Sequence, residues 1–331
     1  MQFVNGTPFS AKMQCGSTGD REMICIIACK VTYVLEEGCL IPAPPEESWP
    51  VFDNPFVFQA VPLAIDLDFR RNGADVVVFG KARAPQASPC RSMRAGIHSG
   101  SLRYEVDVHG DRWWLRSGRG LVASEAQPFI EMPITNDRAF GGASTANGLP
   151  SAYSANPTGR GYYENEQEAE GNPLPNLERP EAPIRRWDER PRPAFFYKLA
   201  PDLLPEELQT RSPEQLTTRL AVEGFNGAIR ELVVEPSQLG ESIRLSGFSP
   251  TGDSLFPTPH RAGPTAHAFI GSARGRFPSA ISSIVLLADE QVLVVTYLCL
   301  FRYLMSPMEK RGVELRWNQD PRVRPVSGRN S

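Results

Sequence analysis

The sequence is poor in the residues that most often bind metals or build disulfide frameworks. Its 331 residues include 6 cysteines and 4 histidines, without a C-x-x-C pair or an H-E-x-x-H run. Cys25 and Cys29 lie in a segment that we predict to be a strand, where about 13 Å separates them. A disulfide needs Cα atoms within about 7 Å, so this pair cannot form one. We expect buried free thiols in a reducing compartment, no metal and no cofactor, although His98 and His109 could meet across a hairpin.

Long hydrophobic runs are missing as well. Residues 1–6 lack the basic start and the apolar stretch of a secretory signal. The longest apolar segment, Val292–Leu304, has 13 residues and contains Thr296 and Arg302. A helix needs about 20 residues to cross a bilayer. We therefore expect a cytoplasmic protein that has no membrane partner.

Neither sign of charge is in excess. Lys+Arg number 35 and Asp+Glu 38, which gives a net charge of -3. Nucleic acids and anionic membranes bind concentrated basic surfaces, so we expect no nucleic acid partner. The phosphate-binding G-x-x-x-x-G-K-[ST], the dinucleotide-binding G-x-G-x-x-G and the nucleophile motif G-x-S-x-G are all absent. The missing motifs favour a protein that is not an enzyme.

Turn-forming residues, in contrast, are abundant. The chain has 27 glycines and 31 prolines beside 41% hydrophobic residues. Such a composition is typical of a globular protein with many turns and long ordered loops, and it disfavours a helical bundle.

Alternating hydrophobic residues predict strands. The odd-numbered residues of 23–35 are all apolar, whereas the even-numbered ones include Lys30 and Thr32, which predicts a strand with one face on a core. Residues 75–81 predict a strand buried on both faces. Asp289-Glu290 predicts a hairpin turn. Further short strands are predicted at 231–235, 243–247, 283–287, 292–304 and 313–317.

Two other segments carry clear local signals. The alternation in 102–108, followed by Gly110-Asp111, predicts a hairpin with 112–115. Ser212-Pro213-Glu214-Gln215 predicts the start of a helix. The predicted fold is mainly β, an antiparallel sandwich or barrel-like core with a long irregular middle segment and few short helices. We expect three regions packed as one continuous unit: a β region at 1–125, a loop-rich segment at 126–195, and a mixed, then β, region at 196–331.

The loop-rich segment carries three motif blocks in a fixed order. They are Met132-Pro133-Ile134 with Arg138-Ala139-Phe140-Gly141-Gly142, then Asn156-Pro157-Thr158-Gly159-Arg160-Gly161, and then Leu174-Pro175-Asn176-Leu177-Glu178-Arg179-Pro180. Between the last two, Glu164, Glu166, Glu168 and Glu170 predict a solvated acidic loop.

This series of blocks resembles a bacterial domain-of-unknown-function family. Its members act as adaptors, or chaperones, that load toxic effectors onto the type VI secretion spike. Residues 29–33 are similar to one of the family's strands, and residues 38–43, 80–85 and 110–113 match the family too. The likeness covers about residues 1–180 and diverges beyond them. It implies a non-catalytic adaptor whose partners are a type VI effector and the valine–glycine repeat spike protein.

The first block has two interpretations. Gly141 and Gly142 permit backbone conformations closed to other residues, so that Phe140 can enter a core where the chain turns. Arg138 can bind loop carbonyls or a carboxylate such as Glu178. The block then holds a long loop in shape. The alternative is that the same residues contact the partner directly.

Trp113 and Trp114 are adjacent on a predicted strand and must point to opposite faces. We expect one in the core and the other at the surface as an interface anchor. The candidate binding residues are therefore Trp113, Trp114, Arg138, Phe140, Gly141 and Gly142.

Two other function classes stay open at this stage. One is a β-sandwich hydrolase or carbohydrate-processing enzyme that uses carboxylates such as Asp107, Asp111 or Glu178. It would need a cleft with two carboxylates about 5–10 Å apart. The other is a structural module that travels with the secreted spike.

Overall fold

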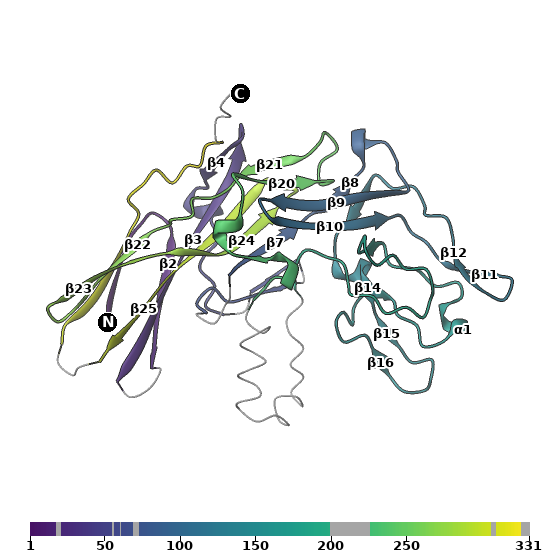
Figure 1. Cartoon of the computed structure of the whole chain (residues 1–331), viewed down its shortest axis with the longest axis horizontal. Coiled ribbons are helices and arrows are strands. Elements are labelled where there is room, and N and C mark those ends of the chain that lie inside the picture. The colour runs from purple at the N-terminus through teal and green to yellow at the C-terminus, as the bar shows by residue number, and fades with distance from the viewer. Residues whose placement is uncertain are drawn as a thin grey trace.

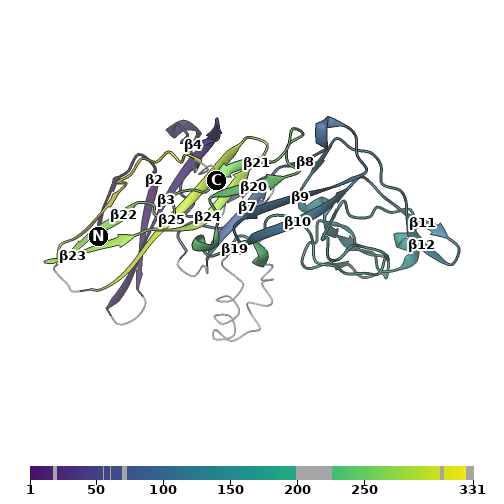
Figure 2. The same cartoon turned by 45° about the horizontal axis from the view of Figure 1, so that its top comes forward.

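The computed structural model describes residues 1–17, 21–54, 56–59, 61–68, 73–198, 226–305 and 309–325. They form an elongated molecule built from sheets (Figure 1). A four-stranded wing lies at one end, and a loop-rich lobe that carries the three motif blocks lies at the other (Figures 1 and 2). Between them, two larger sheets pack on one core.

The central sheet has seven strands in the order β19-β7-β24-β25-β3-β2, with β4 also paired to β3. Its members are β2 (Ser10–Ser17), β3 (Glu22–Glu36), β4 (Cys39–Pro42), β7 (Ala74–Phe79), β19 (Val233–Val234), β24 (Ala280–Leu287) and β25 (Val292–Leu304). The predicted strands at 23–35 and 292–304 are confirmed, as is the hairpin between β24 and β25. The strand predicted at 75–81 ends earlier, at Phe79. The long pair β3–β25 is antiparallel from Val34↔Val292 to Glu22↔Leu304.

The face of β3 that was predicted to be polar is buried, which corrects the expectation of a single core face. Lys30 and Thr32 are each 3% exposed. Lys30 Nζ lies 2.6 Å from Asp66 Oδ2 and 3.5 Å from the centre of the Phe52 ring. Asp66 also accepts hydrogen bonds from the backbone N–H of Phe52 and from Thr296 Oγ1. A buried charge is tolerated here because it is paired and hydrogen-bonded.

The second sheet has five strands in the order β18-β10-β9-β20-β21. Its members are β9 (Ser92–Ser99), β10 (Leu102–His109), β18 (Leu177–Glu178), β20 (Ser242–Ser246) and β21 (Ser254–Pro257). The predicted hairpin between 102–108 and 112–115 is wrong, because β10 pairs with β9. Gly100, at φ +57°, makes that tighter turn. Beyond Gly110 the chain pairs elsewhere, and β11 (Trp114–Ser117) forms its own hairpin with β12 (Gly120–Ala123).

The two sheets and the segment at 194–197 share one hydrophobic core. Tyr197 stacks on Phe79 of β7 with ring centres 5.4 Å apart, and Phe196 meets the ring of Tyr104 of β10 edge-on at 5.2 Å. The mainly β prediction is confirmed, and the sheets do not close into a barrel. The seven-stranded sheet is mixed, because β7 and β24 pair in parallel, whereas the five-stranded sheet is antiparallel throughout.

The wing is a four-stranded sheet in the order β1-β26-β22-β23. Its strands are β1 (Gln2–Gly6), β22 (Thr265–Ile270), β23 (Ala273–Pro278) and β26 (Arg311–Arg316). Val313 and Leu315 of β26 and Ala266 and Ala268 of β22 belong to the main core, so one face of the wing is buried. The other face carries the residues that alternate with these.

The remaining described elements are short. The strands are β5 (Phe56–Phe58), β6 (Val61–Leu63), β8 (Lys81–Arg83), β13 (Glu131–Pro133), β14 (Phe140–Gly141), β15 (Ala143–Ser144), β16 (Ser151–Ala152) and β17 (Arg160–Gly161). The helices are α1 (Glu166–Ala169) and the 3-10 turns η1 (Pro45–Glu47), η2 (Pro85–Ala87), η3 (Asn136–Arg138), η4 (Arg230–Leu232) and η5 (Pro236–Gln238). The helix predicted from Ser212 lies outside the described residues. Within them, no helix has the length and hydropathy to cross a membrane.

The acidic run at 164–170 is bound to the rest of the lobe, which corrects the prediction of a solvated loop. Arg116 pairs with Glu166 at 2.7 Å and with Glu170 at 2.5 Å. The side chain of Glu168 accepts a hydrogen bond from the backbone N–H of Glu164. The run thus forms the short helix α1 and holds it against the strand that carries Arg116.

Candidate functional site

The lobe (residues 111–123 and 136–191) has a hydrophobic core of its own. Its six buried members come from β11, from the first and third motif blocks and from the chain around them: Trp114, Phe140, Tyr163, Ala169, Leu174 and Ile184. The rings of Phe140 and Tyr153 meet edge-on with centres 5.0 Å apart. Phe140 of the first block and Leu174 of the third thus pack in a small cluster of their own, whereas other residues of the same two blocks belong to the main core, namely Met132, Ile134, Ala139 and Leu177.

The first two blocks are joined by a two-residue parallel ladder, in which Phe140 pairs with Arg160 and Gly141 with Gly161. Gly141 and Gly142 have φ angles of +152° and +117°, which favour glycine. A Cβ on Gly141 would overlap the carbonyl oxygen of Asn156, and one on Gly142 would lie 3.0 Å from the carbonyl oxygen of Gly159. The glycines thus let the second block approach the backbone of the first.

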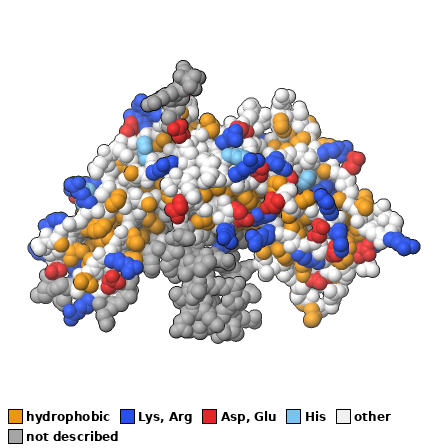
Figure 3. Space-filling model, in the orientation of Figure 1, with side chains coloured by type: hydrophobic (Ala, Val, Ile, Leu, Met, Phe, Trp, Pro, Cys, Tyr) orange, Lys and Arg blue, Asp and Glu red, His pale blue; other side chains and the backbone are white. Residues whose placement is uncertain are grey.

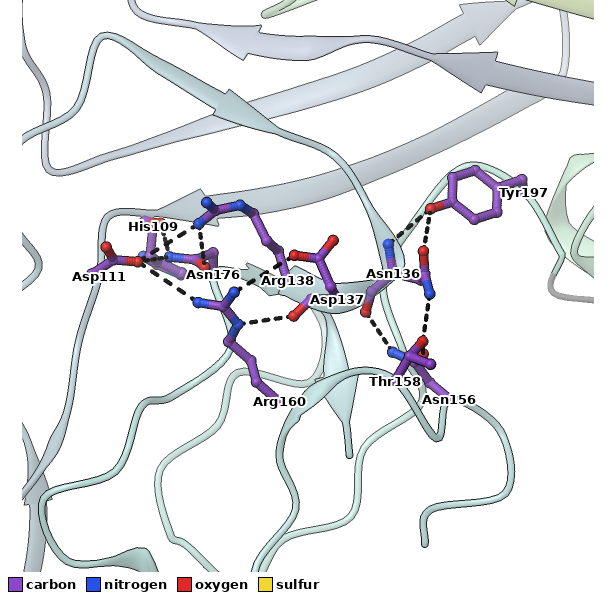
Figure 4. A network of polar contacts seen from close by, with 10 residues as sticks. All are labelled: His109, Asp111, Asn136, Asp137, Arg138, Asn156, Thr158, Arg160, Asn176 and Tyr197. Carbon is purple, nitrogen blue, oxygen red and sulfur yellow. Dashed lines mark hydrogen bonds and ion pairs between the residues drawn. The ribbon is translucent and has the colours of Figure 1, made fainter. Parts of the chain in front are cut away.

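Asn156 of the second block is fully buried and fixes the turn of the first. Its Nδ2 donates to the carbonyl oxygens of Asn136 at 2.7 Å and Phe140 at 3.1 Å. Asn136 in turn donates its backbone N–H to the hydroxyl of Tyr197 at 2.8 Å (Figure 4). Since Tyr197 lies in the main core, this chain of hydrogen bonds ties the lobe to the sandwich.

Asn176 of the third block is the second buried connector. Its Nδ2 donates to the His109 carbonyl at 3.1 Å and to Asp111 Oδ1 at 3.0 Å, and its Oδ1 accepts from Arg138 Nη1 at 3.1 Å (Figure 4). The backbone N–H of Asn176 also donates to the Arg138 carbonyl. One amide side chain thus joins the end of β10 to the first and third blocks.

A charged cluster lies next to these buried amides and reaches the surface. Its members are Asp111, Asp137, Arg138 and Arg160 (Figure 4). Asp111 Oδ1 is 3.7 Å from Arg138 Nη1 and 3.9 Å from Arg160 Nη1. Arg160 Nη2 lies 3.7 Å from Asp137 Oδ2. Partial burial lowers the pKa of Arg160, and the positive charge of Arg138 lowers that pKa further. Guanidiniums and carboxylates in this arrangement can exchange hydrogen bonds with a protein surface.

The six candidate binding residues differ in how far they are buried. Trp114 and Phe140 are 1% and 2% exposed, and Gly141 and Gly142 are buried too. In this structure these four residues shape the lobe and are not on its surface. Trp113 is half-buried, and the Arg138 side chain is 26% exposed. Of the six, Trp113 and Arg138 are the two that a partner can reach.

The structure also locates the carboxylates of the enzyme alternative. Asp107 and Glu178 are cross-strand neighbours on β10 and β18. Both oxygens of Asp107 are bound by Arg94. Glu178, predicted as a partner of Arg138, is bound instead by Arg112 at 2.5 Å and by the backbone N–H of Ile184 at 3.0 Å. Each carboxylate of this pair is thus occupied by protein donors.

The two histidines that could have met lie at opposite ends of the β9–β10 hairpin, which corrects that expectation. His98 pairs with Arg103 beside the turn, whereas His109 pairs with Ser92 at the far end. Burial lowers the pKa of both imidazoles. In the described part of the chain, no three His, Cys, Asp or Glu residues are grouped so as to hold a metal ion.

The cysteine pair that the structure brings together is one that the sequence spacing did not single out. Cys15 of β2 and Cys25 of β3 are register partners, and their sulfur atoms lie 3.1 Å apart. Burial and the neighbouring Cys15 raise the pKa of the Cys25 thiol.

The asparagine beside a proline in two blocks, Asn156-Pro157 and Pro175-Asn176, predicts turns. The hydrogen-bond partners of these asparagines and the role of Arg160 have no signal in the sequence. Asparagine side chains commonly hydrogen-bond the nearby backbone at turns.

Comparison with protein-family models matches residues 20–297 to a family described as an uncharacterized protein conserved in bacteria (DUF2169). The match extends past residue 180, where the motif resemblance diverges. No curated protein and no solved structure matches the chain.

Proposed function

From the premise that this chain belongs to the bacterial family DUF2169, we propose that it is a non-catalytic adaptor, or chaperone, for type VI secretion. It binds a toxic effector in the cytoplasm and helps to load it onto the valine–glycine repeat spike protein. Its role is to supply binding energy at the junction of effector and spike, and to shield the effector until the spike is assembled.

The observation that carries this proposal is the ordered series of motif blocks, which resembles the effector-loading adaptors. The use that the fold makes of these blocks supports a binding role. Phe140 and Leu174 form a small core, Asn156 and Asn176 fix the turns, and Arg138 and Arg160 lie at the surface. Most of these motif residues stabilise the shape of the lobe, which suits a protein that binds another protein better than it suits an enzyme.

A mainly β adaptor has two ways to bind a protein. It can add a strand of the partner to a sheet edge, or it can dock an apolar patch. The order of the wing sheet leaves β1 and β23 as its end strands. Trp113 and Arg138 provide side chains of the kind that often anchor interfaces.

Deletion of the gene tests the proposal. We expect the loss of one effector from the medium while the secreted tube protein stays at its normal level, because an adaptor stabilises one junction and contributes nothing to sheath or tube assembly. Both proteins are measured side by side in the deletion strain and in the complemented strain. An equal loss of both would identify a structural part of the machine instead.

Carboxylate variants separate the adaptor from an enzyme. Asp107→Asn and Glu178→Gln keep the size of the side chains, and we expect them to leave effector secretion unchanged as long as the variants fold. Undiminished secretion after deletion, together with a hydrolytic activity that these substitutions abolish, would overturn the proposal.

A further inference from the structure

The outward face of the wing contains a groove of about 580 Å³. Figure 3 shows hydrophobic side chains gathered over the wing, with Lys and Arg side chains at its margin. The groove is formed by all four strands, because the residues that alternate with the core-facing ones point into it. It lies at the other end of the molecule from the lobe and its charged cluster (Figure 2).

The register of the wing arranges these outward residues in rows across the sheet. One row is Gln2, Gly312, Phe269 and Arg274, and the next is Val4, Glu314, His267 and Arg276. Gly312 is essential to this shape, because a Cβ there would overlap the ring of Phe269. The ring therefore lies down over β26 and forms an apolar floor beside the arginines.

The charges in the groove are unbalanced. Glu314 is held by Arg316 at 2.5 Å, and Arg274 lies over the Phe269 ring with its guanidinium carbon 5.2 Å from the ring centre. Arg276 is exposed and makes no hydrogen bond or ion pair with the described residues. Three arginines thus face one glutamate on a chain whose net charge is -3. A surface of this kind attracts a negatively charged partner.

The spacing of the arginines fits an extended chain. β23 is an end strand of the wing, paired on one side to β22. Arg274 and Arg276 are two residues apart on it, which places them about 7 Å apart on one face. A strand added along β23 repeats its own side chains at the same interval, so carboxylates at alternate positions would meet both arginines.

We propose that the wing binds an extended acidic segment of a partner protein, which adds a strand to β23 and places alternate carboxylates against Arg274 and Arg276. This inference rests on the proposed function, because it supplies the surface and the chemistry by which the adaptor holds a partner.

A second copy of the chain fits this edge poorly. Symmetric pairing of two β23 strands would place Arg274 and Arg276 of one copy against the same arginines of the other, and like charges directly opposite each other destabilise a sheet. An acidic protein segment can hydrogen-bond the free edge of β23 with its backbone and pair with the arginines through its carboxylates.

The test is a binding titration with the full chain. The probe is a short fluorescent peptide that alternates aspartate with valine, and its control has asparagine in place of aspartate. We expect saturable binding of the acidic peptide, followed by fluorescence anisotropy, and none of the control. Arg276→Glu should weaken binding about tenfold or more, because it places like charges together. Arg276→Lys should retain most of the affinity.

Arg119→Glu is the matched control. Arg119 is also exposed, has no ion pair among the described residues, and lies in the β11–β12 turn at the lobe end of the molecule (Figure 1). The Arg119→Glu variant changes the net charge by the same amount but lies far from the groove. We therefore expect its affinity for the peptide to stay within about twofold of the wild type. If Arg119→Glu and Arg276→Glu weaken peptide binding equally, the loss of affinity comes from the net charge alone and the proposal is overturned.

Three further outcomes would also overturn it. They are the absence of saturable peptide binding, equally tight binding of a single-stranded DNA that Arg276→Glu weakens too, and a dimer in sedimentation that Arg276→Glu dissociates. Each would assign the groove to no ligand or to a different one.

Copurification separates this inference from the proposed function. If effector and spike protein copurify equally with the wild type and with Arg276→Glu, the groove is not the contact and the adaptor role stands. If neither copurifies with the wild type, the adaptor role fails, and the peptide titration decides on the groove alone.

Discussion

Gly141 combines a positive φ with close contact to a neighbouring backbone. A β-branched side chain there must relieve both the φ of +152° and the overlap with the Asn156 carbonyl. We expect Gly141→Val to lower the free energy of unfolding by roughly 1–3 kcal/mol or more, measured by urea denaturation. Gly148 has a φ of +80° but open space around it, so Gly148→Val is the control for backbone strain alone. Equal losses in the two variants would mean that the contact with Asn156 does not matter.

The Cys15–Cys25 pair makes a second prediction at the scale of single residues. Directly opposite residues on antiparallel strands have Cα atoms about 4.5–5.5 Å apart, within the range of a disulfide. Added oxidised glutathione should convert the two thiols to a disulfide, and the two electrons reduce glutathione disulfide to two thiols. Mass spectrometry of unreduced peptides should find the Cys15–Cys25 cross-link, and Cys15→Ser should abolish it. A mixed disulfide on Cys15 that never resolves would contradict the prediction.

The roles of single residues were only partly visible in the sequence. The glycine pair pointed correctly to a special backbone, because the range of φ open to a residue depends on its type. The partners of Asn156, Asn176 and Arg138 depend on which loops approach each other, and no local pattern contains that information. The carboxylate that lies beside Arg138 is Asp111, and Glu178 pairs with Arg112 instead.

Between elements, the buried ion pair of Lys30 and Asp66 joins β3 to the segment before β7. Its charges are each 4% exposed, so removal of one leaves the other buried without that partner. Asp66→Ala or Lys30→Met alone should each cost about 3–5 kcal/mol of unfolding free energy. The double variant Lys30→Met, Asp66→Leu should lose less than the sum of the single losses, as a double-mutant cycle measures. Additive losses would show that the two charges do not interact.

Elements with strong local alternation could be predicted, and their partners could not. Residues 23–35 and 292–304 each read as strands, but their antiparallel pairing joins the two ends of the chain. The hairpin at Gly110-Asp111 failed because Gly100 offered a tighter turn for the same strand. Both cases follow from one cause, since propensity and periodicity act within a few residues and sheet pairing does not.

At the scale of the whole molecule, the two cores should open independently. The β3–β25 pair belongs to the large shared core, whereas the lobe closes on six buried side chains. In native-state hydrogen exchange, we expect peptides from 22–36 and 292–304 to exchange only by global unfolding, and those from 140–161 to exchange sooner by local opening. Mass spectrometry resolves these peptides. Protection of the lobe for as long as β3 would mean that the molecule opens as one unit.

The pairing of β1 with β26 and of β3 with β25 has a consequence for how the protein is made. A ribosome adds about 5–20 residues per second, so β3 emerges on the order of tens of seconds before its neighbour β25 is synthesised. During that time a long apolar strand has one edge without its final neighbour. Newly made chains are therefore most prone to join one another while still attached to the ribosome, so a lower rate of initiation, which keeps fewer of them side by side, should increase the yield of folded protein.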